Sequence, residues 1–258
     1  SAILEGVASL LESGATHPTL ELLFTTGEEH FCVGAKAFDA QRLQSKTAYV
    51  MDLSGPVGDC AVAAPTLITF SAEVVGKAAH AGFAPEDGVH AIQVAAAAVA
   101  NLPSGRWGDV TVNVGTISGG RATNIVPDSC TVTGEIRALC HQDALDRLNE
   151  IHSEFVEQAQ AVDAKLNFNH TIHITGYRVD TDAPVAQRFR QACAAVGVAP
   201  RFTGTYGGSD CNILSAHGIQ GLVVATAMNN CHAVNEYTTV EELCKAGRLA
   251  QALMEKQD

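Results

Sequence analysis

The apolar residues of this chain follow two different patterns, and the second pattern interrupts the first. Residues 2–13 carry apolar side chains at helical spacing, the runs 20–25 and 49–53 are typical of short buried strands, and 31–40 is expected to be a helix. Helices and apolar strands alternate again from residue 183 to the end. Apolar strands that alternate with helices predict a parallel α/β sheet covered on both faces.

The middle of the chain instead predicts a β-α-β-β-α-β unit, the ferredoxin-like α+β arrangement. The strands are expected over 66–75, 110–117, 130–139 and 165–175, and the helices over 88–102 and 143–160. We therefore expect residues 1–64 and 177–258 to form one α/β domain, with residues 65–176 inserted into it as a smaller domain. A cleft between two such domains is the expected place for a ligand.

Composition narrows the class of function. The chain carries 16 Lys and Arg against 28 Asp and Glu, a net charge of −12, which argues against nucleic acid or a membrane surface as a partner. No apolar run approaches the roughly 20 residues that span a bilayer. The eight cysteines form no C-x-x-C pair and several lie in apolar runs, which favours reduced thiols and a cytoplasmic location.

Acidic and imidazole side chains follow several strands of the predicted α/β domain. Glu28 and Glu29 come after the first apolar run. Asp52 ends the second run, and His232 lies in a loop after a later strand. Because open α/β sheets place ligands at the carboxyl ends of their strands, we expect these residues to meet at one edge. Mixed carboxylate and imidazole ligands suit zinc first, with cobalt or manganese as alternatives.

Each of these residues also has a purely structural explanation. Thr26 with Glu29 three residues later would form a capping box, and Asp52 precedes the turn Ser-Gly-Pro. Cys231 beside His232 would offer a thiolate ligand instead. His80, in Gly-Lys-Ala-Ala-His-Ala-Gly, would be an ordinary loop histidine, and Gly-Gly-Ser at 207–209 would be only a glycine turn before a helix.

Six motifs occur together in order: TTGEE, YVMD, GKAAHAGFAPEDGVHAI, GGRATNIVPD with EIRA, YGGSD, and the histidine of the last long loop. In this order they resemble the dinuclear zinc metallopeptidase superfamily of aminopeptidases, aminoacylases and carboxypeptidase G. The resemblance is strongest to its peptidase T-like, or tripeptidase, branch and covers nearly the whole chain. It implies a zinc-peptidase-type catalytic domain with an inserted dimerisation or lid domain.

The resemblance also implies a role for each motif. Glu28 would be the general base that takes a proton from the attacking water. Glu29 would bind one of two divalent ions and Asp52 would bind the other. His232 would be a second ligand of the ion that Glu29 binds. In a homodimer, His80 would reach the partner's active site and stabilise the oxyanion. The residues that would contact substrate are His80, Asn124, Arg137, Gly207 and Gly208.

The implied activity is metal-dependent hydrolysis of a peptide or amide bond in a small peptide, with a metal-activated water as the nucleophile. Two alternatives stay open. One is an N-acyl amino acid amidohydrolase or deacylase of the same superfamily, and the other is a non-catalytic dimerisation or binding module.

The sequence departs from the superfamily pattern before the Glu-Glu pair. The superfamily places a His-x-Asp histidine and a metal-bridging aspartate there, and this sequence has neither. Its His-x-Asp, His141-Gln142-Asp143, comes after the pair and is expected to begin a helix. We therefore expect a catalytic domain that is incomplete at its N-terminus, with three of five protein ligands, and a chain that is impaired on its own.

Overall fold

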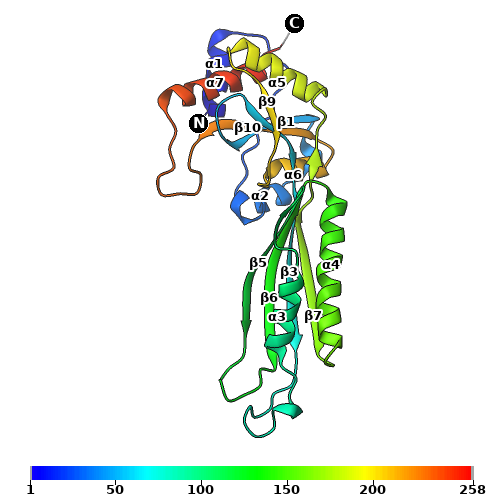
Figure 1. Ribbon diagram of the computed structural model, residues 1–258. Coiled ribbons are helices and arrows are strands. Elements are labelled where there is room, and N and C mark those ends of the chain that lie inside the picture. The colour runs from blue at the N-terminus through cyan, green and yellow to red at the C-terminus, as the bar shows by residue number, and fades with distance from the viewer. Residues whose placement is uncertain (1, 257–258) are drawn as a thin grey trace. The chain divides into compact units, whose positions relative to one another are not determined.

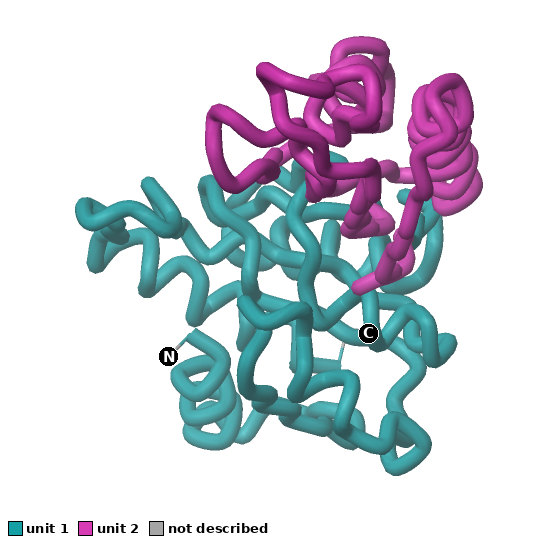
Figure 2. The backbone as a smooth tube through the Cα atoms, turned by 90° about the horizontal axis from the view of Figure 1, so that it is seen from below, with its two compact units in different colours: residues 1–64, 177–258 teal, residues 65–176 magenta. Residues whose placement is uncertain are grey.

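The computed structural model describes residues 2–256; residue 1 and residues 257–258 lie outside the described part. The chain divides into two compact units (Figure 2). Unit 1 contains residues 1–64 and 177–258, and unit 2 contains residues 65–176. Both units combine helices and strands, so the predicted α/β class with an α+β unit inserted in it is confirmed.

Unit 1 is built around a five-stranded sheet. Its strands are β1 (Thr47–Ser54), β2 (Asp59–Ala64), β8 (Tyr177–Arg178), β9 (Arg201–Gly204) and β10 (Gln220–Met228). Its helices are α1 (Ala2–Ser13), α2 (Val33–Ala37), α5 (Pro184–Ala195), α6 (Asp210–Ala216) and α7 (Val240–Met254), with 3-10 turns η1 (Glu28–His30) and η2 (Ala40–Arg42). Helices α1, α5 and α7 lie on one side of the sheet, and α2 and α6 lie on the other (Figure 1).

The sheet of unit 1 is mixed, and the prediction of a parallel sheet is wrong. The order is β1-β10-β2-β8, with β9 also paired to β2. β1 runs parallel to β10 and β9 parallel to β2, whereas β2 runs antiparallel to both β10 and β8. The connection 55–58 between β1 and β2 is too short for a crossover of a dozen or more residues, so the chain turns back and β2 runs opposite to β1 and to β10, which lies between them.

Residues 20–25 form no strand, although their apolar pattern predicts one. Leu22 and Phe24 are 46% and 63% exposed. This segment contacts the segment around residue 44 through a side chain and not through backbone hydrogen bonds between strands. The Glu21 carboxylate accepts hydrogen bonds from the amides of Gln44 and Ser45, at 3.0 and 2.8 Å. An apolar run becomes a strand only when another strand pairs with it, and the sequence of the run alone does not tell whether such a partner exists.

Unit 2 is a five-stranded antiparallel sheet in the order β4-β5-β6-β3-β7. Its strands are β3 (Thr66–Val75), β4 (Gly105–Trp107), β5 (Val110–Gly119), β6 (Ser129–Ala138) and β7 (Lys165–Ile174). Its helices are α3 (Ala91–Asn101), α4 (His141–Gln160) and the 3-10 turn η3 (Pro85–Asp87). The predicted unit is present, with β4 as an addition, and His141 does begin a helix.

One face of the unit 2 sheet is covered and the other is open. Helices α3 and α4 pack on the covered face (Figure 1), where the core includes Phe70, Val132, Ile151 and Phe155. Along β3 the alternate residues Thr69, Ser71 and Glu73 are only partly buried. This alternation follows from the period of two in a strand with one covered face.

All eight cysteines are free thiols, and Cys32, Cys60, Cys130, Cys193 and Cys211 are buried. Among residues 2–256 no helix has the length and apolar character needed to cross a bilayer.

Candidate active site

Glu28 and Glu29 lie on a tightly folded loop, residues 25–34, which we call the Glu28 loop. Gly27, Phe31 and Cys32 all have left-handed backbone angles, with φ of 67°, 59° and 58°. The Cys32 amide donates to the Glu28 carbonyl at 2.8 Å, and the Gly34 amide donates to the Thr26 carbonyl at 2.9 Å. These reversals limit the predicted helix 31–40 to the five residues of α2.

The capping-box explanation for Thr26 and Glu29 is wrong. The turn η1 begins after Gly27, and no side chain caps it. The two glutamates are therefore placed by the backbone of the loop.

His232 lies beside Glu29. Its Nδ1 is 3.5 Å from Oε1 of Glu29, and both side chains are about three-quarters exposed, at 76% and 70%. The loop after β10 holds this histidine with a φ of 65°, and its amide donates to Oε2 of Glu236 at 3.0 Å. Two loops from opposite ends of the sequence thus bring a carboxylate and an imidazole together.

Asp52 and Glu28 complete a group of acidic side chains. Partial burial and the charges of Asp52 and Glu29 raise the pKa of Glu28. Partial desolvation and the charges of Glu29 and Asp210 raise the pKa of Asp52, and His232 opposes this rise. The side chains that influence one another in this way come from the Glu28 loop, β1, α6 and the loop after β10; we call them the acidic cluster, and they are Glu28, Glu29, Asp52, Asp210 and His232.

The donor types of the acidic cluster suit a divalent cation. Within residues 2–256, however, no three His, Cys, Asp or Glu side chains lie close enough together to hold one. Carboxylates that raise one another's pKa are repelling each other, and a cation between them would relieve that repulsion. The donor atoms of these residues therefore suit a metal ion, and Glu29 and His232 are the two whose side chains lie next to each other, with 3.5 Å between Oε1 and Nδ1.

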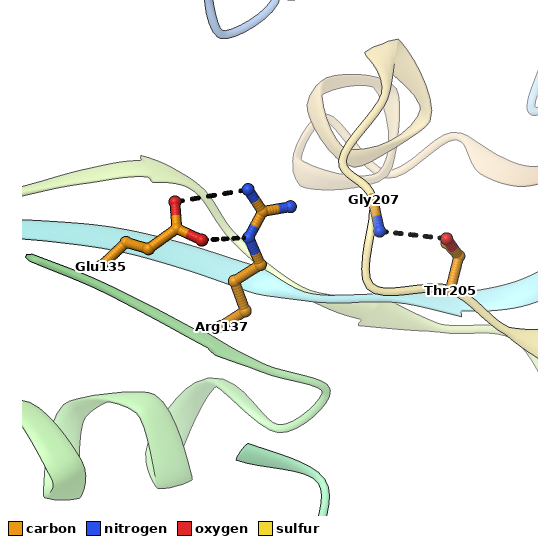
Figure 3. Close-up of polar contacts among 4 residues, drawn as sticks. All are labelled: Glu135, Arg137, Thr205 and Gly207. Carbon is orange, nitrogen blue, oxygen red and sulfur yellow. Dashed lines mark hydrogen bonds and ion pairs between the residues drawn. The ribbon is translucent and has the colours of Figure 1, made fainter. Parts of the chain in front are cut away.

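The motif YGGSD begins helix α6. Ser209 and Asn212 form a capping box, in which the Asn212 side chain accepts from the Ser209 amide at 3.1 Å. The Gly207 amide donates to Oγ1 of Thr205 at 3.0 Å (Figure 3). This amide therefore closes its own turn, and the contact of Gly207 with substrate stays a prediction.

In unit 2, His80 has a defined tautomer. Its Nδ1 accepts from the amides of Gly82 and Phe83 at 3.1 and 3.2 Å, so the proton of the neutral ring is on Nε2. The ring stacks on Phe83 at 4.3 Å between centroids. The Asn124 carbonyl accepts from the Ala81 amide at 3.0 Å, so His80 and Asn124 belong to adjacent loops of unit 2.

Arg137 is paired with a residue that the sequence analysis did not select. Its Nε and Nη2 donate to the two carboxylate oxygens of Glu135 at 2.9 and 3.3 Å (Figure 3). Glu135 also lines a hollow of about 420 Å³ on the sheet of unit 2, together with Thr69, Ser71, Asn113, Thr133 and Asn169. The alternation of β6 places Glu135 and Arg137 on one face, and this spacing was the available signal.

Cys32 and Asp210 are the other residues that the sequence analysis missed. Cys32 Sγ donates to Oε1 of Glu28 at 3.9 Å, and Oγ1 of Thr25 donates to Oδ2 of Asp210. Asp210 belongs to a motif from which only the glycines were selected.

Residues 62–163 match the family model of the M20 peptidase dimerisation domain. The chain is 32% identical over 257 residues to the uncharacterised protein YqjE of Bacillus subtilis. The alignment covers 99% of this chain and 69% of YqjE. The structure superposes on aminopeptidase PepT of Bacillus cereus with a TM-score of 0.93 and 35% identity, covering 98% of this chain and 68% of PepT. A tripeptidase of Staphylococcus aureus gives a TM-score of 0.94 at 27% identity, with the same coverage of 98% and 68%.

Proposed function

Because the chain belongs to the M20 peptidases, in their peptidase T-like branch, we propose that the protein hydrolyses a peptide bond in small peptides, with tripeptides as the first substrates to test. The observation that carries the proposal is the acidic cluster of unit 1. In it a half-buried glutamate, Glu28, lies beside the Glu29–His232 pair. The likeness to an aminopeptidase and a tripeptidase at 35% and 27% identity supports the substrate class.

We propose that Glu29, Asp52 and His232 hold divalent metal ions, with zinc first and cobalt or manganese as alternatives. Two carboxylates and an imidazole are donors that these ions accept. When bound, such ions polarise the scissile carbonyl and acidify water. Three protein ligands are few for two ions, so we expect this chain alone to bind metal weakly and to be impaired.

Glu28 is the general base of the proposed reaction. Its carboxylate takes a proton from the attacking water and returns it to the leaving amine, and a raised pKa suits both transfers. The Cys32 thiol donates to Oε1 of Glu28 and leaves Oε2 for the water.

The residues of unit 2 are proposed to bind substrate in a homodimer. His80 has its proton on Nε2, the form in which this atom donates to an oxyanion. Arg137 would bind the terminal carboxylate of the peptide, with Asn124 as a further contact from unit 2. Gly207 and Gly208, which belong to unit 1, are also proposed to contact substrate. The match to a dimerisation domain supports the dimer, and the free thiols suit a reducing, cytoplasmic setting.

The test compares wild type with Glu28→Gln in the protein at its native length, supplied with zinc, cobalt or manganese. We expect tripeptide hydrolysis that falls by ~10²–10⁴-fold in kcat in the variant. Glu12→Gln, an exposed carboxylate on α1, is the matched control and should be unchanged.

The substrate panel includes dipeptides, tripeptides and N-acyl amino acids. Preference for N-acyl amino acids would replace the peptidase proposal with the deacylase alternative. Equal rates of hydrolysis in wild type and Glu28→Gln would reject Glu28 as the general base. No hydrolysis with any ion would reject the proposed activity and favour a binding module.

A further inference from the structure

The Glu28 loop contacts the rest of unit 1 at Thr25, which is hydrogen-bonded to Asp210 of α6, and at Glu29, which lies beside His232. We propose that Asp210 is a positioning residue whose carboxylate holds the Glu28 loop, through the Thr25 hydroxyl, in the arrangement that aims Glu28 at the reacting water. The inference rests on the proposed role of Glu28 as general base.

A hydrogen bond between side chains joins Thr25 to Asp210. Thr25 is the first residue of the loop, and its Oγ1 donates to Oδ2 of Asp210, a residue 185 positions away. The other oxygen, Oδ1, is buried and has no hydrogen-bond partner among residues 2–256. The carboxylate is therefore turned inward to Thr25 rather than toward solvent, which is the orientation of a structural acceptor.

Asp210 lies at the capped start of helix α6. It is the first residue of α6, directly after Ser209, and both Ser209 and Asn212 of the capping box are at most 3% exposed. Helix α6 in turn packs on β10 and β1. A side chain on such a fixed helix start is a firm anchor, because its backbone cannot move without breaking the cap.

The Glu28 loop is stiffened by hydrogen bonds within its own backbone. Its backbone hydrogen bonds, from Cys32 to Glu28 and from Gly34 to Thr26, close it on itself. Because these bonds make the loop stiff, the attachment at Thr25 also influences where Glu28 lies.

Cys32 provides an independent observation on the same side of the loop. Its side chain is 2% exposed, and its thiol donates to Glu28. Burial, with the nearby charges of Asp210 and Glu28, raises the pKa of Cys32 to about 12, so the thiol remains a donor. Asp210 thus contacts the loop at Thr25 and its charge also acts on Cys32, near the other end of the loop.

The test uses Thr25→Val, which removes the hydroxyl at nearly constant shape, and Thr25→Ser, which retains it as the matched control. Hydrogen exchange of residues 25–34 is measured by mass spectrometry in the metal-free protein, with helix α5 as the internal reference. We expect the loop amides to exchange roughly tenfold faster in Thr25→Val and in Asp210→Ala, as loss of one hydrogen bond to a charged group allows. Thr25→Ser and helix α5 should be unchanged.

A second readout uses the native-length enzyme with its metal. Thr25→Val should lower kcat roughly tenfold with little change in KM, because substrate contacts are intact while the base is misplaced. The double variant Thr25→Val/Asp210→Ala should be no slower than Asp210→Ala alone, since the bond that Thr25→Val removes is already lost in Asp210→Ala.

Two outcomes would overturn the inference: equal exchange of the loop in Thr25→Val and Thr25→Ser, or equal acceleration of the loop and of α5, which would indicate global destabilisation. Failure of the proposed function is separate. It would appear as absence of peptide hydrolysis in wild type, while the exchange experiment would still decide whether Asp210 holds the loop.

Discussion

Gly34 is a glycine of the Glu28 loop that has no room for a side chain. A methyl group there would overlap the carbonyl oxygen of Thr26 and lie 2.6 Å from its amide nitrogen, and both are backbone atoms. We expect Gly34→Ala to open the loop, with a loss of about 1–3 kcal/mol in stability and at least a roughly tenfold loss of activity.

Urea denaturation and tripeptide assays check this prediction. Gly115→Ala is the control, because its methyl would meet only ordinary contacts at 3.8 and 3.9 Å. Identical unfolding midpoints for the two variants would contradict the proposed tightness of the loop.

At the residue scale, the sequence could name candidates but not the contacts between them. Motif order selected Glu28, Glu29, Asp52 and His232, and the structure adds that His232 lies beside Glu29. The roles of all these residues stay predictions. Asp210 was missed because its partner Thr25 is 185 residues away, and no spacing rule connects two positions so far apart.

At the scale of elements, Arg188 ties helix α5 to the end of helix α7. Its Nε donates to the Leu253 carbonyl at 2.7 Å, and its Nη2 donates to the Glu255 carbonyl. These carbonyls are at the C-terminal end of α7, where helical partners are lacking and positive charge is favourable. We expect Arg188→Met to destabilise unit 1 by about 1–3 kcal/mol, measured by urea denaturation.

The matched control is Arg147→Met on α4. Arg147 pairs with Glu150 three residues later, a partly exposed surface pair, so its loss should change stability by about 0–1 kcal/mol. A loss at Arg188 no larger than at Arg147 would contradict the capping role.

The elements of unit 2 were predictable and those of unit 1 less so, for a physical reason. In unit 2 one face of the sheet is open, so buried residues such as Phe70, Ala72 and Val74 alternate with polar residues along β3. This alternation predicts a strand from the sequence. Strand β2 is buried at every residue and shows no such period, so its sequence does not predict a strand. The left-handed Phe31 and Cys32 likewise shorten a helix that composition alone favours.

At the scale of the whole molecule, buried thiols make the two units respond differently to alkaline pH. Cys60, Cys193 and Cys211 of unit 1 are each 0% exposed. Burial raises the pKa of Cys193 to about 11 and that of Cys211 to about 12, from 9.0, and raises the pKa of Cys60 as well. Unit 2 contains one buried thiol of this kind, Cys130.

The unfolded chain releases these protons at lower pH than the folded chain does. Their contribution to stability is therefore complete below about pH 9 and is lost as pH rises toward 11–12, by at most about 1.4 kcal/mol per pH unit for each group. We expect unit 1 to unfold before unit 2 between about pH 9.5 and 11, as pulsed hydrogen exchange can show. Cys193→Ala should weaken the pH dependence, and prior loss of unit 2 would contradict the prediction.

The two crossings between the units lie at paired strand ends. Ala64 pairs with Tyr177 in unit 1, and Leu67 pairs with Ile174 in unit 2. A polypeptide that passed from Ala64 to Tyr177 through a two-residue hairpin turn would keep β2 and β8 joined. Residues 65–176 therefore form a separable insertion. A recombination event that replaced them with a short turn between Ala64 and Tyr177, or with another domain, would leave the strands of the sheet that carries Asp52 intact.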